Sequence, residues 1–213
     1  MVGGALPDVE QGPSLHRLTL QEMPRAIDVL VRAFECDPFV DWVVRSDAGR
    51  QEGMRRFFTV CLRYYTMPFD EVWATRDIDG VAMWTPPPGT LKSGPSQQAR
   101  FFWQAVRGMQ LRNVPSRLSA FSEIERHHPR TPHYYLFFLG VDPERQGEGI
   151  GSRMLVSMLN RCDTEGMPAY LEATHAGLIP FYGHHGYQER PPILLPHGGP
   201  ALYPMWRDPR PSE

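Results

Sequence analysis

The sequence is poor in lysine and has no long hydrophobic run. Of its 22 basic residues only Lys92 is a lysine, and the arginines do not cluster. With 24 acidic residues and a formal net charge of −2, the chain does not match the charge of a nucleic-acid backbone or an anionic membrane. The longest apolar stretch, Tyr134 to Val141, is far shorter than the roughly 20 residues of a membrane helix. We therefore expect neither a nucleic acid nor a membrane as partner.

Cysteine is also scarce. Cys36, Cys61 and Cys162 are odd in number and widely separated, which excludes a disulfide framework and a typical zinc motif. The histidine pairs 127–128 and 184–185 have no acidic or cysteine partner at ligand spacing, so we expect no metal. The N-terminus lacks the basic start and apolar run of a secretory signal, which favours a cytoplasmic location.

Glycine and proline are abundant, with 19 and 22 residues. Such an excess is typical of irregular chains, but 41% hydrophobic residues are enough for a sizeable core. A length of 213 residues predicts one domain. We expect a flexible tail at residues 1–14 and a single domain over 15–213.

The N-terminal half is predicted to be mainly helical. A capping box formed by Thr19 and Glu22 precedes apolar residues at helical spacing, and Asp37-Pro38 is expected to end this helix. A second helical pattern closes at Pro68, and a third is interrupted by Pro115. The expected helices cover residues 19–37, 49–65 and 96–128.

Elsewhere the apolar residues follow the pattern of strands. Residues 71–75 and 81–85 predict a hairpin, because Asp79-Gly80 can supply the positive backbone angle of a tight turn. The apolar run 133–141 is typical of a central strand buried on both faces. Further strands are expected at 15–18, 169–173, 188–195 and 201–207, and further helices at 149–164 and 178–184. This order predicts a mixed α/β (α+β) fold.

The most informative segment is a glycine-rich loop between a strand and a helix. In Gln146-Gly147-Glu148-Gly149-Ile150-Gly151, amides at the helix start have no intrahelical partner and can hold an anion. The glycines allow phosphate oxygens to approach the main chain, so a pyrophosphate is a natural ligand. A simple turn is the alternative. A dinucleotide fingerprint is not met because residue 152 is serine, and a P-loop would need a lysine.

The loop and the segments after it resemble the GCN5-related N-acetyltransferases (GNAT). Gln146, Gly149 and Gly151 match the family's acetyl-CoA signature Gln/Arg-x-x-Gly-x-Gly/Ala. Downstream, the segments 168–172, 180–182 and 185–187 are similar to the fifth strand, the Phe-Tyr helix and the entry to the sixth strand. The motifs span about residues 133–190. Segments 33–38, 81–85, 170–174 and 205–207 are similar to those of puromycin N-acetyltransferase-like members.

This resemblance implies a fold and a way of binding acetyl-CoA. The expected GNAT fold has a mixed, mostly antiparallel central sheet, splayed between strands 4 and 5, with helices on both faces. Main-chain groups of Leu139 and Val141 would contact the pantetheine, and the amides of 146–152 would hold the pyrophosphate. The resemblance thus gives as cofactor-binding residues Leu139, Gly140, Val141, Gln146, Gly147, Glu148, Gly149, Ile150, Gly151 and Ser152. We expect Arg145 to be an exposed arginine.

Two catalytic residues are carried over by the same resemblance. Tyr182 would be the general acid that protonates the leaving thiolate, the alternative being a core aromatic. Glu172 would be the general base that takes the amine proton, the alternative being a capping or ion-paired carboxylate. The other candidate bases are His175, Glu35 and Asp37.

The predicted activity is direct transfer of an acetyl group from acetyl-CoA to a primary amine of a small molecule in a ternary complex. Aromatic residues in the N-terminal helices and the 86–128 segment favour an acceptor with an aromatic or apolar body. Leu178 departs from the family, which commonly has a cofactor-binding asparagine there, and a leucine cannot make that hydrogen bond. The alternatives are a silent acyl-CoA-binding or sensing module, another acyl donor, or a hydroxyl acceptor. The protein could be a monomer or a homodimer.

Overall fold

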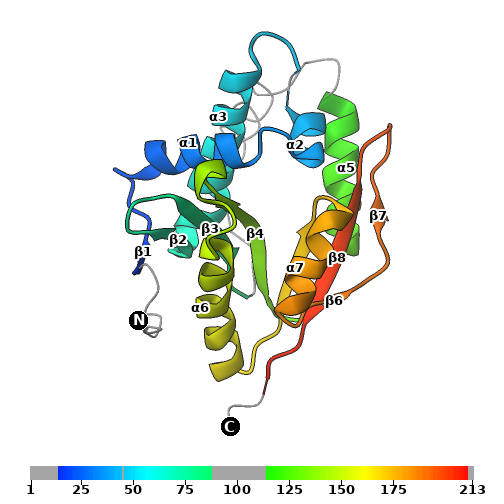
Figure 1. Cartoon of the computed structure of the whole chain (residues 1–213). Helices are drawn as coiled ribbons and strands as arrows, with labels where there is room; N and C mark the ends of the chain where they lie inside the picture. Colours follow the sequence, from blue (N-terminus) through cyan, green and yellow to red (C-terminus); the bar gives the residue numbers. More distant parts are fainter. Residues whose placement is uncertain (1–13, 45, 88–113, 211–213) are drawn as a thin grey trace.

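A computed structural model describes residues 14–44, 46–87 and 114–210 (Figure 1). Its centre is an eight-stranded sheet with the strand order β1-β2-β3-β4-β5-β8-β6, in which β7 also pairs with β8. Among the described strand pairs, β4 and β5 alone run parallel, and the others are antiparallel. The strands are β1 Leu15–Arg17, β2 Val72–Thr75, β3 Gly80–Thr85, β4 Tyr134–Val141, β5 Ala169–Ala173, β6 Gln188–Glu189, β7 Ile193–Leu194 and β8 Ala201–Arg207.

Helices cover both faces of this sheet. The described α-helices are α1 Met23–Ala33, α2 Pro38–Val43, α3 Arg50–Val60, α5 Val114–His127, α6 Ile150–Thr164 and α7 Ile179–His184. One core lies between the sheet and α1 and α3, and a second lies between the sheet and α6 and α7. A smaller cluster joins α2, α5 and β7. The mixed, mostly antiparallel fold with helices on both faces is therefore confirmed.

A bulge in β4 opens the sheet. Met83 pairs with Phe138 while the next residue of β3, Trp84, pairs with Leu136, so Phe137 is an extra residue in β4. Pairing of β4 with β5 ends at Leu136 and Leu171, and the two strands then separate. In a regular strand Leu136 and Phe138 would face the same side of the sheet. Because of the bulge they face opposite sides, Leu136 toward α6 and Phe138 toward α1. The splay expected between the fourth and fifth strands is present.

The prediction that 133–141 is buried on both faces is only half correct. Tyr134, Leu136 and Phe138 are buried, whereas the residues between them are half-buried. For Leu139 and Val141 the reason is the splay, because β5 no longer pairs beside them and both residues border the pocket.

The N-terminal helix ends earlier than predicted. The capping box forms, with Thr19 N donating to Glu22 Oε2 at 2.9 Å, but regular helix begins only at Met23. α1 ends at Ala33, and Asp37 instead caps a further helix, α2, by accepting from the amides of Phe39 and Val40. The sequence does not predict α2, because a proline at the start of a short helix is also typical of the end of the helix before it.

The β2–β3 hairpin forms, but the strained residue of its turn is not the predicted one. Ile78 has a positive φ of 53°, whereas Gly80 does not. Gly80 is needed for space, since a Cβ there would lie 2.7 Å from Met154 Sδ and 2.8 Å from Ile150 Cγ2. The turn therefore lets α6 pack directly on the start of β3.

Three other elements differ from their predicted boundaries. α3 continues as a π-helix, Cys61–Thr66, and Pro68 lies in the short 3-10 helix Met67–Phe69. The strand expected at 188–195 is split into β6 and β7 around Pro191-Pro192, as proline removes a ladder hydrogen bond. Pro115 lies at the start of the described part of α5, and residues 96–113 of that predicted helix lie outside the described residues.

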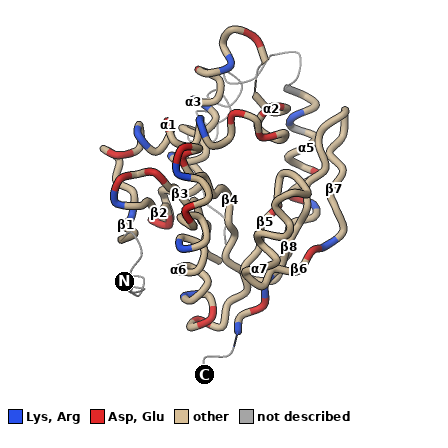
Figure 2. The backbone as a smooth tube through the Cα atoms, in the orientation of Figure 1, with Lys and Arg blue, Asp and Glu red and all other residues tan. Residues whose placement is uncertain are grey.

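Charged residues of both signs are distributed along the described chain. Basic and acidic residues both occur in α1, the β2–β3 hairpin and α6 (Figure 2). Within the described ranges, no helix combines the length and apolarity that crossing a membrane requires.

A buried ion pair ties α6 to β8. Arg207, which is 3% exposed, donates from both terminal nitrogens to the two carboxylate oxygens of Asp163 at 2.7 Å each. Arg207 Nε also donates to the carbonyl of His185 at 3.1 Å, directly after α7. Burial raises the pKa of Asp163, but the hydrogen bonds from Arg207 and the Arg210 amide outweigh burial and hold this pKa below its ordinary value.

Replacing Asp163 with asparagine is expected to lower the free energy of unfolding by about 3 kcal/mol at pH 7, because it leaves Arg207 buried without its counter-charge. The pKa of Asp163 is lowered by folding, so its stabilisation is present above the ordinary aspartate pKa. It is lost as the pH falls through the lower folded value. Urea titrations at pH 7 and pH 3 measure both effects. Asp41→Asn, at an exposed ion pair with Arg50, should cost less than about 1 kcal/mol. Equal losses in the two variants would contradict this prediction.

Candidate active site

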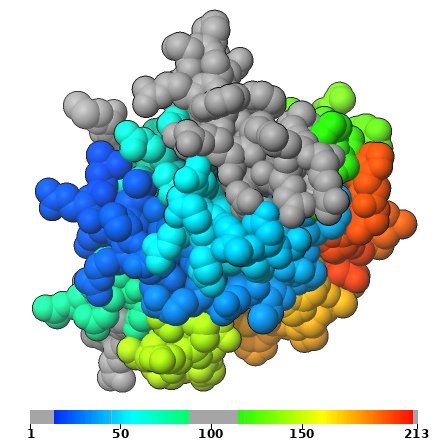
Figure 3. All heavy atoms as spheres, turned by 90° about the horizontal axis from the view of Figure 1, so that it is seen from above, coloured from blue at the N-terminus to red at the C-terminus, as the bar shows by residue number. Residues whose placement is uncertain are grey.

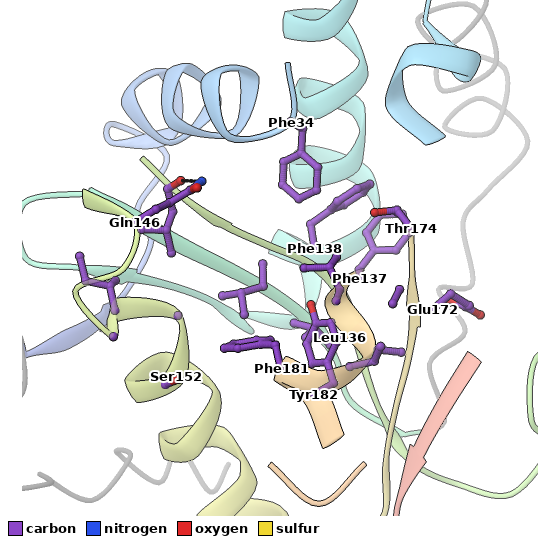
Figure 4. A pocket seen from close by; sticks show the side chains of 18 of the residues that line it. Phe34, Leu136, Phe137, Phe138, Gln146, Ser152, Glu172, Thr174, Phe181 and Tyr182 are labelled. Atoms are coloured by element: carbon purple, nitrogen blue, oxygen red, sulfur yellow. Dashed lines mark hydrogen bonds between the residues drawn. The ribbon is translucent and has the colours of Figure 1, made fainter. Parts of the chain in front are cut away.

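A pocket of about 470 Å³ lies where β4 and β5 separate. Its walls come from the two strands, the loop before α6, the first turn of α6, and α7. Gln146 and Glu172 lie at opposite sides of it, with Phe181 and Tyr182 between them (Figure 4). Seen from the side of α1–α3, the segment that begins α6 (yellow-green) and the segment around α7 (orange) lie side by side (Figure 3). The pocket thus joins the glycine-rich loop to both predicted catalytic residues.

The glycine-rich loop forms one end of the pocket. Gly147 and Gly149 have positive φ angles of 84° and 76°, and Gly149 is the N-cap of α6. The first bond of the helix runs from the amide of Arg153 to the Gly149 carbonyl at 3.0 Å. The amides of Ile150, Gly151 and Ser152 therefore have no helical acceptor, and they lie at the positive end of the helix dipole. The site has the chemistry of an anion cradle.

Side chains hold this loop in place. Gln146 Nε2 donates to the Val141 carbonyl at 3.1 Å, which fixes the chain between β4 and α6. Arg145 forms ion pairs with Glu148 at 2.8 Å and with Asp79 at 2.9 Å. Arg145 lines the pocket and is half-exposed, as expected. Glu148 is exposed and does not line the pocket, so only its main chain belongs to the cradle.

The open edge of β4 lies between the loop and the catalytic residues. The amide of Asp142 bonds to the Asp79 carbonyl on the β3 side. The N–H and C=O groups of successive residues in a strand point to opposite sides. Those of Leu139 and Val141 therefore point away from β3, into the gap between β4 and β5. Both residues line the pocket. Gly140 does not, and a Cβ there would lie 2.9 Å from Leu30 Cδ2, so this glycine lets α1 pack closely behind the site.

Tyr182 projects from α7 into the pocket and is 8% exposed. Its ring packs against Phe181 and Tyr187, with centroids 5.0 and 5.9 Å away. Burial raises the pKa of the Tyr182 phenol well above its ordinary value, and the negative charge of Asp37 adds to this. The hydroxyl therefore remains protonated at physiological pH, so it can donate a proton but not serve as a base.

Glu172 lies on β5 at the other end of the pocket, and its side chain is only 5% exposed. Tyr135 donates to Glu172 Oε2 at 2.6 Å. Oε1 is buried and has no hydrogen-bond partner. The nearest cation-forming group is His128, whose Nδ1 lies 3.7 Å from Oε1. Glu172 is thus neither a helix cap nor the partner of an arginine, and it has one free, buried oxygen.

The other candidate bases are less suitably placed. The carboxylate of Asp37 caps α2 and accepts from the Thr174 hydroxyl. His175 is exposed. Glu35 accepts from Gln51 at 3.4 Å, outside the pocket. None of these three residues lines the pocket, whereas Glu172 does.

Sequence reasoning missed several pocket residues. The bulge places Phe137 in the wall, and it is joined there by Phe34 directly after α1, Thr174 directly after β5, and Phe181 from α7. Phe34, Thr174 and Phe181 stand within segments similar to the family, but nothing in those segments marked them as pocket residues. Of the aromatics in the N-terminal helices, Phe58 is in the core and Trp42 packs against Arg117, whereas Tyr65 packs on Phe137 of the pocket wall. Residues 101–103 lie outside the described residues.

Two further features bear on ligand chemistry. Leu178, at the position where an asparagine was expected, lines the pocket and packs on the α6 core, so it contributes an apolar wall. In the described part of the chain, no three His, Cys, Asp or Glu side chains are grouped so that they could hold a metal ion.

Comparison with known proteins gives a consistent result. The sequence model of the acetyltransferase (GNAT) family matches residues 79–187. An uncharacterised N-acetyltransferase of Schizosaccharomyces pombe, C550.08, is 37% identical over 62 residues, which cover 29% of this chain and 25% of that relative. The chain therefore matches only about a quarter of that relative's length.

Solved structures are similar over almost the whole chain. A histone acetyltransferase HPA2 and related acetyltransferase from Corynebacterium glutamicum has a TM-score of 0.70 and 25% identity, covering 94% of this chain and 98% of that one. A polyamine N-acetyltransferase from Drosophila melanogaster, which forms N-acetylagmatine, has a TM-score of 0.59 and 14% identity over 92% and 99% of the two chains. Since the family match covers more than half of the sequence and includes both the glycine-rich loop and Tyr182, this chain belongs to the acetyltransferase (GNAT) family.

Proposed function

We propose that this protein transfers an acetyl group from acetyl-CoA to a primary amine of a small molecule, by direct attack in a ternary complex. The observation that carries the proposal is one pocket that has an anion cradle at one end and is lined by Glu172 at the other, with Tyr182 between them. Acetyl-CoA would supply the activated acetyl group as a thioester. The residues present fit it, because unpaired amides, an open strand edge and an apolar wall follow one another along the pocket.

Different main-chain groups would bind different parts of acetyl-CoA. The amides of 147–152 would hold the pyrophosphate, since they face no helical acceptor. The Leu139 and Val141 main chains would bind the pantetheine along the open edge of β4. The Val141 amide would also polarise the acetyl carbonyl, as a fixed donor aimed at developing negative charge.

The catalytic residues would move two protons. Glu172 would take one proton from the acceptor ammonium, so that the nitrogen lone pair can attack the carbonyl carbon. As the C–N bond forms and the C–S bond breaks, the Tyr182 hydroxyl would give its proton to the leaving sulfur. The second proton, which the attacking nitrogen loses as it becomes an amide, would return to the Tyr182 oxygen and restore the phenol. Both groups are buried, which strengthens their electrostatic effect on the reaction.

The acceptor is proposed to have an apolar or aromatic body. Phe34, Phe137 and Phe138 line the pocket beyond Tyr182, and each offers apolar surface. Neighbouring structures include enzymes described as acting on polyamine and agmatine, which favours small-molecule amines as a class.

A panel of acceptors tests the proposal. Thiol release from acetyl-CoA would be measured with 2-phenylethylamine, tyramine, puromycin, agmatine and spermidine, and acetylated products identified by mass. 2-Phenylethanol is the matched hydroxyl control, and propionyl-CoA tests donor length. Turnover is expected with an aromatic amine and not with the alcohol. Binding of acetyl-CoA by calorimetry without transfer to any amine would instead support a silent acyl-CoA-binding module.

A further inference from the structure

A group of polar and aromatic side chains lies against β5 on the face opposite α6. Ala169, Leu171 and Ala173 pack toward α6, so the residues between them, Tyr170 and Glu172, face the other way. There they meet the end of α5 and the start of β4. We call this group the histidine cluster, and it consists of His128, His133, Tyr135, Tyr170 and Glu172.

Hydrogen bonds within the cluster determine where the histidines carry their protons. His133 Nδ1 lies 2.6 Å from the Thr131 carbonyl, which can only accept, so this nitrogen must carry a proton. His133 is 8% exposed, and burial lowers its pKa, outweighing the bond to Thr131. In the neutral ring, Nε2 is therefore an acceptor.

The tautomer of His128 follows from that of His133. Its Nε2 lies 3.1 Å from His133 Nε2 and must donate, because the other nitrogen has no proton to give. A neutral His128 accordingly has its lone pair on Nδ1, which is the atom that faces Glu172 Oε1 at 3.7 Å. Nδ1 and Oε1 are then both hydrogen-bond acceptors and repel each other, so a separation longer than a hydrogen bond is expected. A proton arriving on Oε1 would turn the contact into a hydrogen bond.

Glu172 needs such an exit for its proton. Its Oε2 accepts from Tyr135, and its Oε1 is buried without a partner. The Tyr170 hydroxyl lies close to the Glu172 carboxylate without completing a hydrogen bond to it. Burial, followed by the charge of Glu172 and this close approach, raises the pKa of Tyr170, so it remains a donor. The Glu172 side chain is 5% exposed, whereas that of His128 is 31% exposed. Of the two, only His128 has a substantial contact with solvent.

We propose that His128 is the proton relay of the reaction: it takes from Glu172 the proton that came from the acceptor amine and releases it to water, while His133 holds the required tautomer. The amine N–H bond breaks as an O–H bond forms on Glu172 Oε1. That proton then moves to His128 Nδ1, and the imidazolium loses it to solvent. The relay rests on the proposed function of Glu172 as the base.

The tautomers can be tested on the protein alone. Long-range ¹H–¹⁵N correlation spectra of ¹⁵N-histidine-labelled protein should show a proton on Nδ1 of His133 and on Nε2 of His128, assigned with His128→Asn and His133→Asn. A neutral His128 protonated on Nδ1 would overturn the relay, because its lone pair would then face away from Glu172.

The relay itself is tested by chemical rescue. With the best amine of the panel, His128→Ala is expected to lower kcat by about 10-fold or more with little change in KM, and added imidazole should restore it in proportion to its concentration. His127→Ala is the matched control, since this exposed neighbour binds the Glu123 carbonyl at 2.9 Å and lies outside the cluster. Its kcat should be unchanged. A loss in His128→Ala that imidazole does not restore would mean a structural role.

The outcomes separate the relay from the proposed function. If Glu172→Gln is impaired and His128→Ala is as active as the unaltered protein, the relay is wrong and the base assignment stands. If Glu172→Gln retains full turnover, the base assignment is wrong and the relay falls with it. If no amine is acetylated, the proposed function itself fails.

Discussion

Replacing Tyr182 with phenylalanine is expected to lower kcat by about 100-fold or more, with the KM for acetyl-CoA little changed. The reason is that the phenol is a proton donor placed in the pocket between the cradle and Glu172, with a raised pKa that keeps it protonated. Phenylalanine retains the ring contacts with Phe181 and Tyr187, so the variant should fold. Steady-state thiol release from acetyl-CoA measures the effect.

Tyr187 provides a matched control for this substitution. Its hydroxyl is also buried, has no hydrogen-bond partner, and has a raised pKa caused by burial, yet it does not line the pocket. Tyr187→Phe should therefore leave kcat unchanged. If Tyr182→Phe retained full turnover, Tyr182 would be a packing residue and the sulfur would take its proton from elsewhere.

The second large effect is expected for Glu172→Gln, which should lower kcat by about 100-fold or more, because an amide cannot accept the amine proton. The glutamine oxygen can still accept from Tyr135, so the substitution preserves the local hydrogen bond at 2.6 Å. Thiol-release kinetics would be combined with calorimetry of acetyl-CoA binding. Binding should be retained, since the cradle lies at the far end of the pocket.

Glu189→Gln is a suitable control, because this glutamate is exposed on β6 and outside the pocket. It should have the kcat of the unaltered protein. A Glu172→Gln protein that bound acetyl-CoA and turned over at the full rate would show that another group removes the proton.

The sequence was most informative where a ligand site depends on backbone conformation. The loop 146–151 could be recognised because glycine is needed at positive φ, and Gly147 and Gly149 do adopt it. The turn at Ile78 could not be predicted, since a β-branched residue at positive φ is rare and this one is buried in the core beneath α1 and α3. Likewise, Asp37-Pro38 is ambiguous until α2 is seen to pack against β7.

The sequence by itself determined the family, the order of most helices and strands, and the anion cradle, because each depends on residues close together in the chain. Only the tertiary structure decided that Glu172 faces away from α6 toward His128, and that its Oε1 is buried without a partner. The physical reason is the Phe137 bulge, which ends the pairing of β4 with β5 and opens a pocket between segments far apart in sequence. Such a pocket is set by strand register and packing, which no local pattern specifies.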